Sequence, residues 1–372
     1  MIKKLIPIFA AFGLMCASCV EGNVPVTDGD GALSLVIEDP AVTTKAGSDT
    51  GVRTWETAVS SLDVYLLSGG SVMRHEHFSS ATPMQMPYQA DVMGVQSGDY
   101  EVMVLGNAPA AAASATTKAA LDVIAISLDN CPLGGAGFVM SGSAGTVSVV
   151  SGTTRTGSAT LSRYCSRVRL KSVRNAAPYG SITVKGAFLE NVPTSWTLAG
   201  VVNAASVGGW GNLAGRAGGY SASTSPADFI KGAGAVTPVQ YASHLAKFQS
   251  VGIASGATES SSFGWDMYCF PTPNGAAASD QYGPIASTAA VTARPRLVVL
   301  ATVNGTDYFY PVTLATASGE TLARNTSYDV ELTILDTGSS DPNEPVVNGS
   351  IYAVVTGPSS TWTAGNNYDE QL

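Results

Sequence analysis

The three histidines of the chain are the side chains best suited to acid–base or metal chemistry near neutral pH. His75 and His77 lie two residues apart, so they share one face of an extended strand, and two imidazoles so placed could bind a metal ion. No third ligand lies near this pair in the sequence, which favours a solvated strand edge instead. His244 stands alone in a Gly- and Ala-rich part of the chain, and we expect it at the surface.

The sequence lacks the motifs that position catalytic groups in the common enzyme classes. It contains no Gly-x-Ser-x-Gly elbow, no phosphate-binding loop and no His-Glu-x-x-His pair. Residues 28–31 begin like a calcium loop but lack its later glutamate, which indicates a turn. The carboxylates of Glu38 and Asp39 would point to opposite faces of a strand and could not share a proton. We therefore expect no catalytic residue, no metal site, no cofactor and no enzymatic activity.

The composition narrows the fold class and the possible partners. Only 13% of the 372 residues are charged, and 28 acidic residues outnumber 19 basic ones. A nucleic-acid partner is not expected, because Lys and Arg must neutralise its phosphates. The hydrophobic fraction of 45% is too high for a disordered chain, and the low charge argues against a long coiled coil. With 40 glycines and 19 prolines, the sequence indicates a turn-rich, all-β protein.

Alternation of apolar and polar residues predicts short strands and almost no helix. The expected strands span 33–37, 62–66, 100–104, 147–150 and 159–161 in the first half, and 167–171, 181–189, 296–303, 328–334 and 350–356 in the second. In 167–171 basic residues alternate with apolar ones, which predicts one solvated face. Residues 108–120 could form a short helix or a loop, and residues 199–262 show no period. Regular short strands and the chain length predict two β-sandwich domains joined near residues 157–162.

The N-terminus reads as an export signal. Two lysines at positions 3 and 4 precede the apolar stretch 5–15, which is too short to span a bilayer permanently. The stretch ends in Ala17-Ser18-Cys19, which resembles the lipobox of bacterial lipoproteins, with Cys16 where that motif usually has leucine. The resemblance implies a signal peptide over residues 1–18 and a lipid on the sulfur of Cys19. An ordinary secretory signal cut nearby is the alternative.

Three further cysteines, Cys131, Cys165 and Cys269, make an odd number. An exported protein that relies on disulfides usually has an even set, so buried free thiols are favoured over one bridge.

A series of motifs in a defined order covers nearly the whole chain. After Cys19 come the strand 62–67, the segment 97–107 (SGDYEVMVLGN), residues 161–168 (LSRYCSRV), residues 190–193 (ENVP), residues 268–271 (YCFP), residues 308–312 (YFYPV), residues 324–328 (RNTSY), and finally Gly338, 341–342 and 361–362. In this order the motifs resemble the Bacteroidales fimbrillin family, the pilins of type V pili.

The resemblance implies two tandem transthyretin-like, Greek-key β-sandwich domains with long loops. The expected divisions are a signal peptide 1–18, a pro-segment 19–45, an N-terminal domain 46–161, a C-terminal domain 162–345 and a donor segment 346–372. It implies a polymerising stalk subunit, exported as a lipoprotein to the outer membrane and then built into extracellular fimbriae that support adhesion and biofilm. Its partners would be copies of itself, tip and anchor subunits, and a trypsin-like protease, with host or bacterial surface ligands besides.

The same resemblance assigns roles to both ends of the chain. The first strand would be removed by proteolysis, and a neighbouring subunit would fill the groove with its C-terminal strand. The removable strand carries Leu33, Leu35 and Ile37 on one face, and the donor strand carries Ile351, Ala353 and Val355, with Trp362 beyond them. Cleavage is expected between Lys45 and Ala46, or alternatively between Arg53 and Thr54.

A surface lipoprotein that binds glycans or host proteins without polymerising is the competing hypothesis. Its binding surface would be the Gly- and Ala-rich loops of residues 199–262. A lipoprotein component of a nutrient uptake system is a third possibility. Either alternative would retain the first forty-odd residues together with the lipid, whereas a pilin would lose them.

Overall fold

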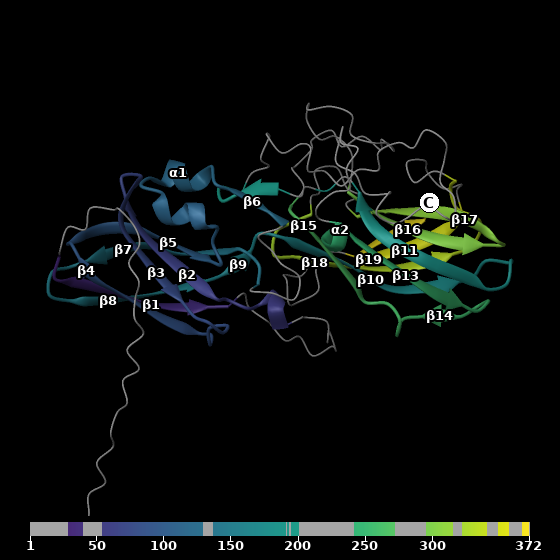
Figure 1. Cartoon of the computed structure of the whole chain (residues 1–372), viewed down its shortest axis with the longest axis horizontal. Coiled ribbons are helices and arrows are strands. Elements are labelled where there is room, and N and C mark those ends of the chain that lie inside the picture. Colours follow the sequence, from purple (N-terminus) through teal and green to yellow (C-terminus); the bar gives the residue numbers. More distant parts are fainter. Residues whose placement is uncertain are drawn as a thin grey trace, which may run out of the picture.

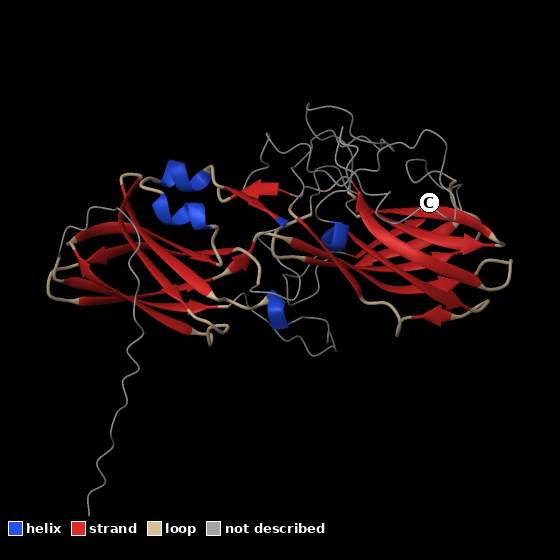
Figure 2. Cartoon of the chain, in the orientation of Figure 1, coloured by secondary structure: helices blue, strands red, loops and turns tan. Residues whose placement is uncertain are grey.

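The computed structural model describes two β-rich lobes side by side (Figure 1). The described residues are 29–39, 54–128, 137–190, 192, 195–200, 242–271, 295–314, 322–340, 349–356 and 367–371. Strands dominate both lobes and helices are few and short (Figure 2), which confirms the all-β, two-sandwich prediction. No helix in the described part of the chain is long and apolar enough to span a membrane.

The N-terminal lobe is a sandwich of a five-stranded and a three-stranded sheet. The larger sheet has the order β3-β2-β5-β7-β9, and the smaller one the order β4-β1-β8. Their bounds are β1 Gly31–Glu38, β2 Ser61–Ser68, β3 Ser71–Ser79, β4 Tyr88–Val95, β5 Gly98–Gly106, β7 Met140–Val149, β8 Thr154–Thr160 and β9 Ser162–Arg163.

Local sequence explains why these strands and turns form. In β4, Ala90 and Val92 are buried while Gln89, Asp91 and Met93 are exposed, which is the alternation of a strand with one face in the core. Gly69 and Gly70 join β2 to β3 with φ of 56° and 80°, a conformation that residues with a Cβ rarely adopt.

The Ala-rich stretch after β5 forms two short helical turns that cover part of the larger sheet. These are η2, Ala110–Ser114, and α1, Lys118–Asp122. A third short helical turn, η1, Thr54–Glu56, lies between β1 and β2 in the sequence. The Thr117 side chain begins α1 by accepting a hydrogen bond from the Ala120 backbone N–H at 3.1 Å. The Tyr65 hydroxyl fixes η2 by donating to the Ala112 carbonyl at 2.9 Å.

The C-terminal lobe is a second sandwich. One sheet has the order β14-β10-β18-β19-β20, with β15 also paired to β10, and the other has the order β13-β11-β16-β17. Their bounds are β10 Ser166–Asn175, β11 Ile182–Glu190, β13 Ala246–Ile253, β14 Thr258–Glu259, β15 Trp265–Cys269, β16 Arg296–Val303, β17 Thr306–Thr313, β18 Ser327–Ile334, β19 Ile351–Thr356 and β20 Asn367–Gln371, with the helical turn α2 at Ala242–Leu245.

A small sheet connects the two lobes. β6, Ala125–Ser127, belongs to the N-terminal half of the chain, and it pairs antiparallel with β12, Ser195–Thr197, which follows β11. Trp196 lies opposite Ile126, and both side chains are buried. The chain first passes from one lobe to the other between β9 and β10, so β12 is a return to the first lobe.

Candidate functional site

The first described strand, β1, lies in the middle of its sheet. It runs antiparallel to β4, with Leu35 opposite Ala90, and parallel to β8, with Leu35 opposite Gly157. Both of its edges are therefore hydrogen-bonded, and removing the strand would leave two open edges facing each other across an empty position.

Three apolar side chains anchor β1 in the core. Leu33, Leu35 and Ile37 are fully buried, as their alternation in the sequence predicts. On the outer face the Ser34 hydroxyl donates to the Asp91 carboxylate at 2.6 Å, while Val36 is 41% exposed. Burial of three such side chains contributes roughly 5–9 kcal/mol, which is comparable to the whole stability of a typical domain. Loss of β1 would expose the apolar core of this lobe to water, which favours binding of another apolar strand at the same position.

The predicted processing residues follow β1. Lys45, Ala46 and Arg53 lie outside the described residues, as do Cys19, Cys131 and Trp362. The description resumes at Thr54, the first residue of η1. Both candidate bonds thus fall between the end of β1 and the start of η1.

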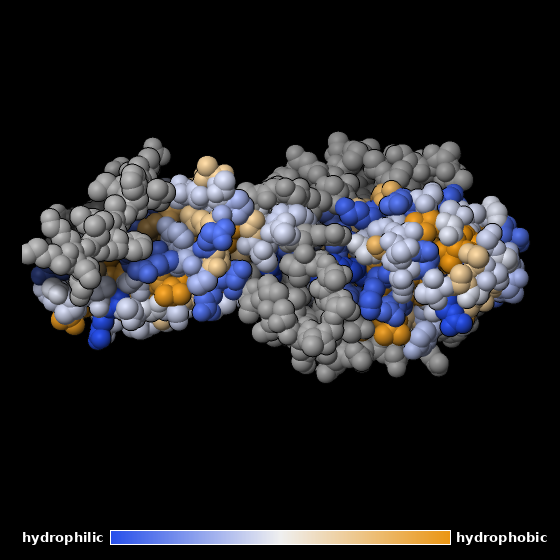
Figure 3. All heavy atoms as spheres, turned by 90° about the horizontal axis from the view of Figure 1, so that it is seen from below, coloured by the Kyte–Doolittle hydropathy of each residue, from blue (hydrophilic) through white to orange (hydrophobic). Residues whose placement is uncertain are grey.

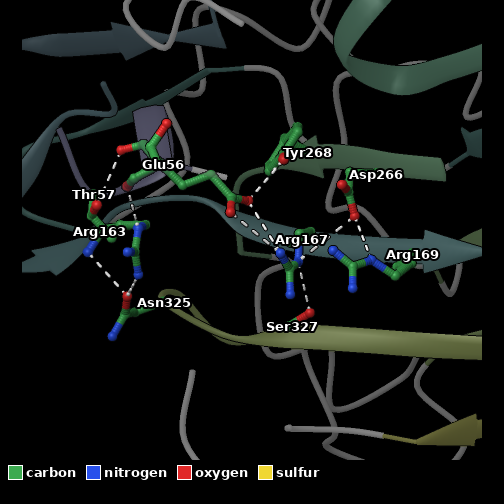
Figure 4. Close-up of polar contacts among 10 residues, drawn as sticks. Glu56, Thr57, Arg163, Arg167, Arg169, Asp266, Tyr268, Asn325 and Ser327 are labelled. Carbon is green, nitrogen blue, oxygen red and sulfur yellow. Dashed lines mark hydrogen bonds and ion pairs between the residues drawn. The ribbon is translucent and has the colours of Figure 1, made fainter. Parts of the chain in front are cut away.

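Immediately after this segment, Glu56 enters a buried polar network where the two lobes meet (Figure 4). Its carboxylate is fully buried and forms an ion pair with Arg167 of β10, with a closest N–O distance of 3.3 Å. The Tyr268 hydroxyl of β15 donates to the same carboxylate at 2.8 Å. Burial raises the pKa of Tyr268, and the nearby negative charge of Glu56 raises it further. Glu56 thus lies against two strands of the C-terminal lobe.

The backbone of η1 is held at the same place. Arg163 Nε donates to the Glu56 carbonyl at 2.7 Å, and Arg163 Nη1 donates to the Asn325 side-chain oxygen at 2.9 Å. Trp55 packs edge-on against Phe138 and Tyr268, with ring centroids 5.2 and 5.6 Å apart. Residues 55 and 56 therefore join the segment after the processing region to both lobes.

The basic strand β10 differs from its sequence prediction. Arg167 is fully buried and Arg169 is 7% exposed, so the basic face of 167–171 is not solvated at these positions. The reason is pairing with acids: Arg167 with Glu56, and Arg169 Nε with Asp266 at 2.6 Å. Asp266 and Tyr268 alternate on β15 and pair in register with Arg169 and Arg167. That complementary alternation is the signal that could have predicted the network.

The C-terminal strand β19 is paired within its own lobe. It lies between β18 and β20, with Ala353 opposite Leu332. Ile351, Ala353 and Val355 are each 2% exposed and belong to the core. They form one apolar face, as predicted, and that face is covered by the rest of the C-terminal sandwich in this structure.

Two of the three histidines, His75 and His244, are less exposed than their sequence context predicted, whereas the His77 side chain is 37% exposed. His75 Nε2 and His77 Nδ1 each lie 2.8 Å from the same oxygen of Asp63, and the His75 ring stacks on Tyr65 with centroids 4.5 Å apart. The His75 side chain is only 5% exposed, and His244 is buried in α2. Among the described residues, no group of three or more ligating side chains could hold a metal ion.

Cys165 and Cys269 are buried thiols that form no disulfide. Desolvation raises the pKa of the Cys269 thiol, so its reactive thiolate form is suppressed at neutral pH. These two cysteines fit the expectation of structural thiols.

A cavity of about 610 Å³ opens beside the junction. Its walls come from β5, β7, α1 and the loop before β18, and they include Glu101, Asp122, Lys118 and Arg324. Arg324 is held in place by the Ser162 carbonyl at 2.7 Å and lies 4.2 Å above the Tyr164 ring. The lining carries two acidic and two basic groups, several serine and threonine hydroxyls, and the apolar side chains of Met103 and Leu198.

Comparison with solved structures places the fold. A fimbrilin of Porphyromonas gingivalis W83 aligns with a TM-score of 0.59 at 12% identity, covering 91% of this chain and 99% of that one. A protein of Bacteroides eggerthii, described as a candidate cell adhesion protein, aligns with a TM-score of 0.57 at 19% identity, covering 90% and 97%. The chain shares the fold of these two proteins. A candidate cell adhesion protein of Parabacteroides distasonis gives a TM-score of 0.58 at 14% identity, with 91% of this chain and 98% of that chain covered. No family model matches the sequence, and no curated protein matches it either.

Proposed function

We propose that this chain is a structural subunit of surface fimbriae that polymerises after β1 is removed by proteolysis. The observation that carries the proposal is the position of β1, which occupies the middle of a sheet with three fully buried anchors and precedes two candidate cleavage bonds. The fold shared with a fimbrilin and with candidate adhesion proteins supports the same conclusion. The role is structural and requires no cofactor and no catalytic residue.

The mechanism uses strand exchange. Cleavage after Lys45, or after Arg53, cuts the covalent link between β1 and the remainder of the lobe. The strand is then held only by its contacts and can be displaced by an intermolecular competitor, because its high effective concentration is lost. A donor strand from another subunit restores the hydrogen bonds to β4 and β8 and fills the three apolar positions. Repeated head to tail, such a contact does not close on itself and builds a filament.

The C-terminal strand is the proposed donor, through Ile351, Ala353 and Val355, with Trp362 following. Its release from between β18 and β20 exposes apolar surface in the donating lobe, and insertion into a neighbour buries apolar surface of the same kind. Proteolysis at the acceptor, which frees β1 to leave, is therefore the step that permits the exchange.

The proposed route to the surface begins with export as a lipoprotein through Cys19. The precursor would be anchored in the outer membrane by this lipid, and removal of residues 1–45 or 1–53 would release the mature subunit into the fimbria. The partners would be further copies of the chain, tip and anchor subunits, and a trypsin-like protease, with surface ligands for adhesion and biofilm formation.

The test is digestion of the purified precursor with a trypsin-like protease. We expect a new N-terminus at Ala46 or Thr54, followed by filaments visible in the electron microscope. A start elsewhere would overturn both cleavage assignments. Monomers that stay single after complete cleavage and concentration would overturn the polymerising role. The matched control is the Lys45→Gln, Arg53→Gln double variant, which should remain uncut in this segment and monomeric.

Saccharide binding without polymerisation is the second candidate function, and the cavity beside the junction favours it. Carboxylates, hydroxyls and the fixed guanidinium of Arg324 can exchange hydrogen bonds with a neutral polyhydroxylated ligand. Saturation-transfer NMR of the uncut protein with a panel of mono- and disaccharides tests this function. Binding that is lost in Asp122→Asn would support it, and absence of transfer from every sugar would remove it.

A further inference from the structure

The position of Leu35 differs from that of the other two anchors of β1. Across the sheet, Leu35 lies between Ala90 on β4 and Gly157 on β8, the smallest side chains available. Ile37 lies between Tyr88 and Ala159, and Leu33 lies between Val92 and Arg155. The middle of the groove is therefore flanked on both sides by the least bulk.

Gly157 makes room for the Leu35 side chain. A Cβ placed on Gly157 would lie 3.0 Å from Leu35 Cδ2, which is tighter than nine in ten real Cβ contacts. The same Cβ would lie 3.6 Å from the Ala144 Cβ and 3.8 Å from Val147 Cγ2, both of which come from β7. We call the space between Ala90, Gly157 and Ala144 the central socket. It is shaped for a long branched side chain.

We propose that the groove left by β1 selects its donor at the central socket, preferring a strand with leucine or isoleucine at the middle of its three inward positions. This inference rests on the proposed exchange of β1. The occupant is a strand of another subunit. Its middle inward residue is a long branched aliphatic one, and the residues two positions before and two positions after it are apolar.

The segment 351–355 of an identical copy meets this requirement poorly. Its inward residues are Ile351, Ala353 and Val355, so alanine occupies the central socket whether the strand enters parallel or antiparallel to β1. Burying an alanine where a leucine fits leaves a void and loses the contacts of the missing atoms.

Shifting the segment along the groove does not repair the fit. Moving it by two residues brings Ile351 or Val355 into the central socket, again in either direction. Ala353 then takes one of the outer anchor positions, and a glycine, Gly349 or Gly357, takes the other. Every alignment that keeps Ile351, Ala353 and Val355 facing inward thus leaves at least one of the three anchor positions of the groove underfilled. A subunit with a leucine-centred donor strand is the better partner.

Peptide exchange on the protease-cut full-length protein tests the selection without altering the donor lobe. Two fluorescent peptides are compared: residues 349–358 and the same peptide with Ala353→Leu. Unlabelled residues 31–38 serve as competitor, because they restore the native contact. We expect the Leu-centred peptide to dissociate at least about tenfold more slowly than the parental one, measured by fluorescence anisotropy.

Substitutions in the groove locate the effect. Gly157→Ala narrows the central socket and should reduce the advantage of the Leu-centred peptide to about twofold or less. Ser158→Ala is the matched control, because Ser158 is the next residue of β8 and is exposed, and it should leave the advantage unchanged. Both variants are first compared with the parent by thermal unfolding.

The outcomes separate the two proposals. Equal dissociation rates for the two peptides would overturn the central socket while leaving strand exchange intact. Failure of either peptide to enter the cut protein, with residues 31–38 remaining bound, would overturn strand exchange and the socket with it. A persistent Leu advantage in Gly157→Ala would show that the preference arises elsewhere in the groove.

Discussion

Glu56→Gln should destabilise the protein far more than the loss of a surface ion pair. Glu56 and Arg167 are both fully buried, and the carboxylate also accepts a hydrogen bond from Tyr268. Glutamine keeps the shape of the Glu56 side chain but replaces one carboxylate oxygen by an NH2 group. At one of the two contacts with Arg167, two hydrogen-bond donors then face each other. Without the Glu56 charge, buried Arg167 keeps the more distant Asp266, whose carboxylate oxygen lies 4.0 Å from Arg167 Nε. Breaking a buried ion pair costs about 3–5 kcal/mol.

Urea denaturation of purified parent and variant measures this cost. The matched control is Glu331→Gln, which removes another carboxylate salt-bridged to β10: Glu331 pairs with Lys171 at 2.7 Å, but both side chains are about half exposed. An exposed pair contributes about 0–1 kcal/mol. If Glu56→Gln loses no more stability than Glu331→Gln, the junction is not held by this ion pair and our interpretation of the network is wrong.

A variant that removes both charges sharpens the same test. Replacing Glu56 by leucine and Arg167 by methionine leaves no buried charge from this pair, so part of the stability lost in Glu56→Gln should return. If the double variant is less stable than Glu56→Gln, the charges contribute more to the junction than a well-packed apolar contact of similar size.

Three further predictions concern the core. Leu35→Ala in the uncut precursor should cost about 2–5 kcal/mol of unfolding free energy in urea, because the central socket is left partly empty; a loss below 1 kcal/mol would contradict it. Burial raises the pKa of Tyr268 in the folded state, so its contribution to stability is complete below the unfolded pKa of about 10 and is lost as pH rises above it. Tyr268→Phe should therefore flatten the fall in stability measured between pH 9 and 11. Cys165 and Cys269 should react with a thiol reagent at pH 7.5 only after unfolding, as followed by mass spectrometry; fast labelling of the native protein would contradict their burial.

The elements of this fold were predictable where local patterns decide them. The alternation of Leu33, Leu35 and Ile37 identifies a strand and its buried face, because period-two alternation is a local property. Its neighbours were not predictable, since β4 follows about fifty residues later and β8 more than a hundred. The parallel pairing of β1 with β8 depends on the packing of the whole lobe.

The junction was missed for a related reason. Glu56 lies in a stretch without any period, and charged residues in such a stretch are usually solvated. The burial of Arg167 and Arg169 is possible only because Glu56 and Asp266 arrive from distant segments. A single sequence shows which residues are charged, but it does not show which of them lie in contact in the folded chain. The two histidines near Asp63 illustrate the same limit, because the carboxylate that both of them contact comes from β2, and only His75 is buried there.

The exposed apolar residues are scattered on the face of the molecule drawn in Figure 3. On the face in Figure 3, apolar residues form small separate patches on both lobes instead of one broad band. Among the described residues, Met93 and Val36 are the exposed apolar side chains of the β4-β1-β8 sheet, at 62% and 41% exposure. The described residues of this face therefore form no large apolar surface through which the protein could adhere.

The pairing of β6 with β12 has a consequence for the order of folding during synthesis. A chain that emerges N-terminus first presents β1 to β9 before residues 195–197 follow. The edge of β6 then lacks its partner, and the Tyr164 hydroxyl lacks the Leu198 carbonyl, to which it donates at 2.9 Å. The N-terminal lobe is thus completed only after synthesis of the next lobe has begun, and an unpaired strand edge is open to association in the interval. A chaperone that binds extended segments would find its substrate during this interval.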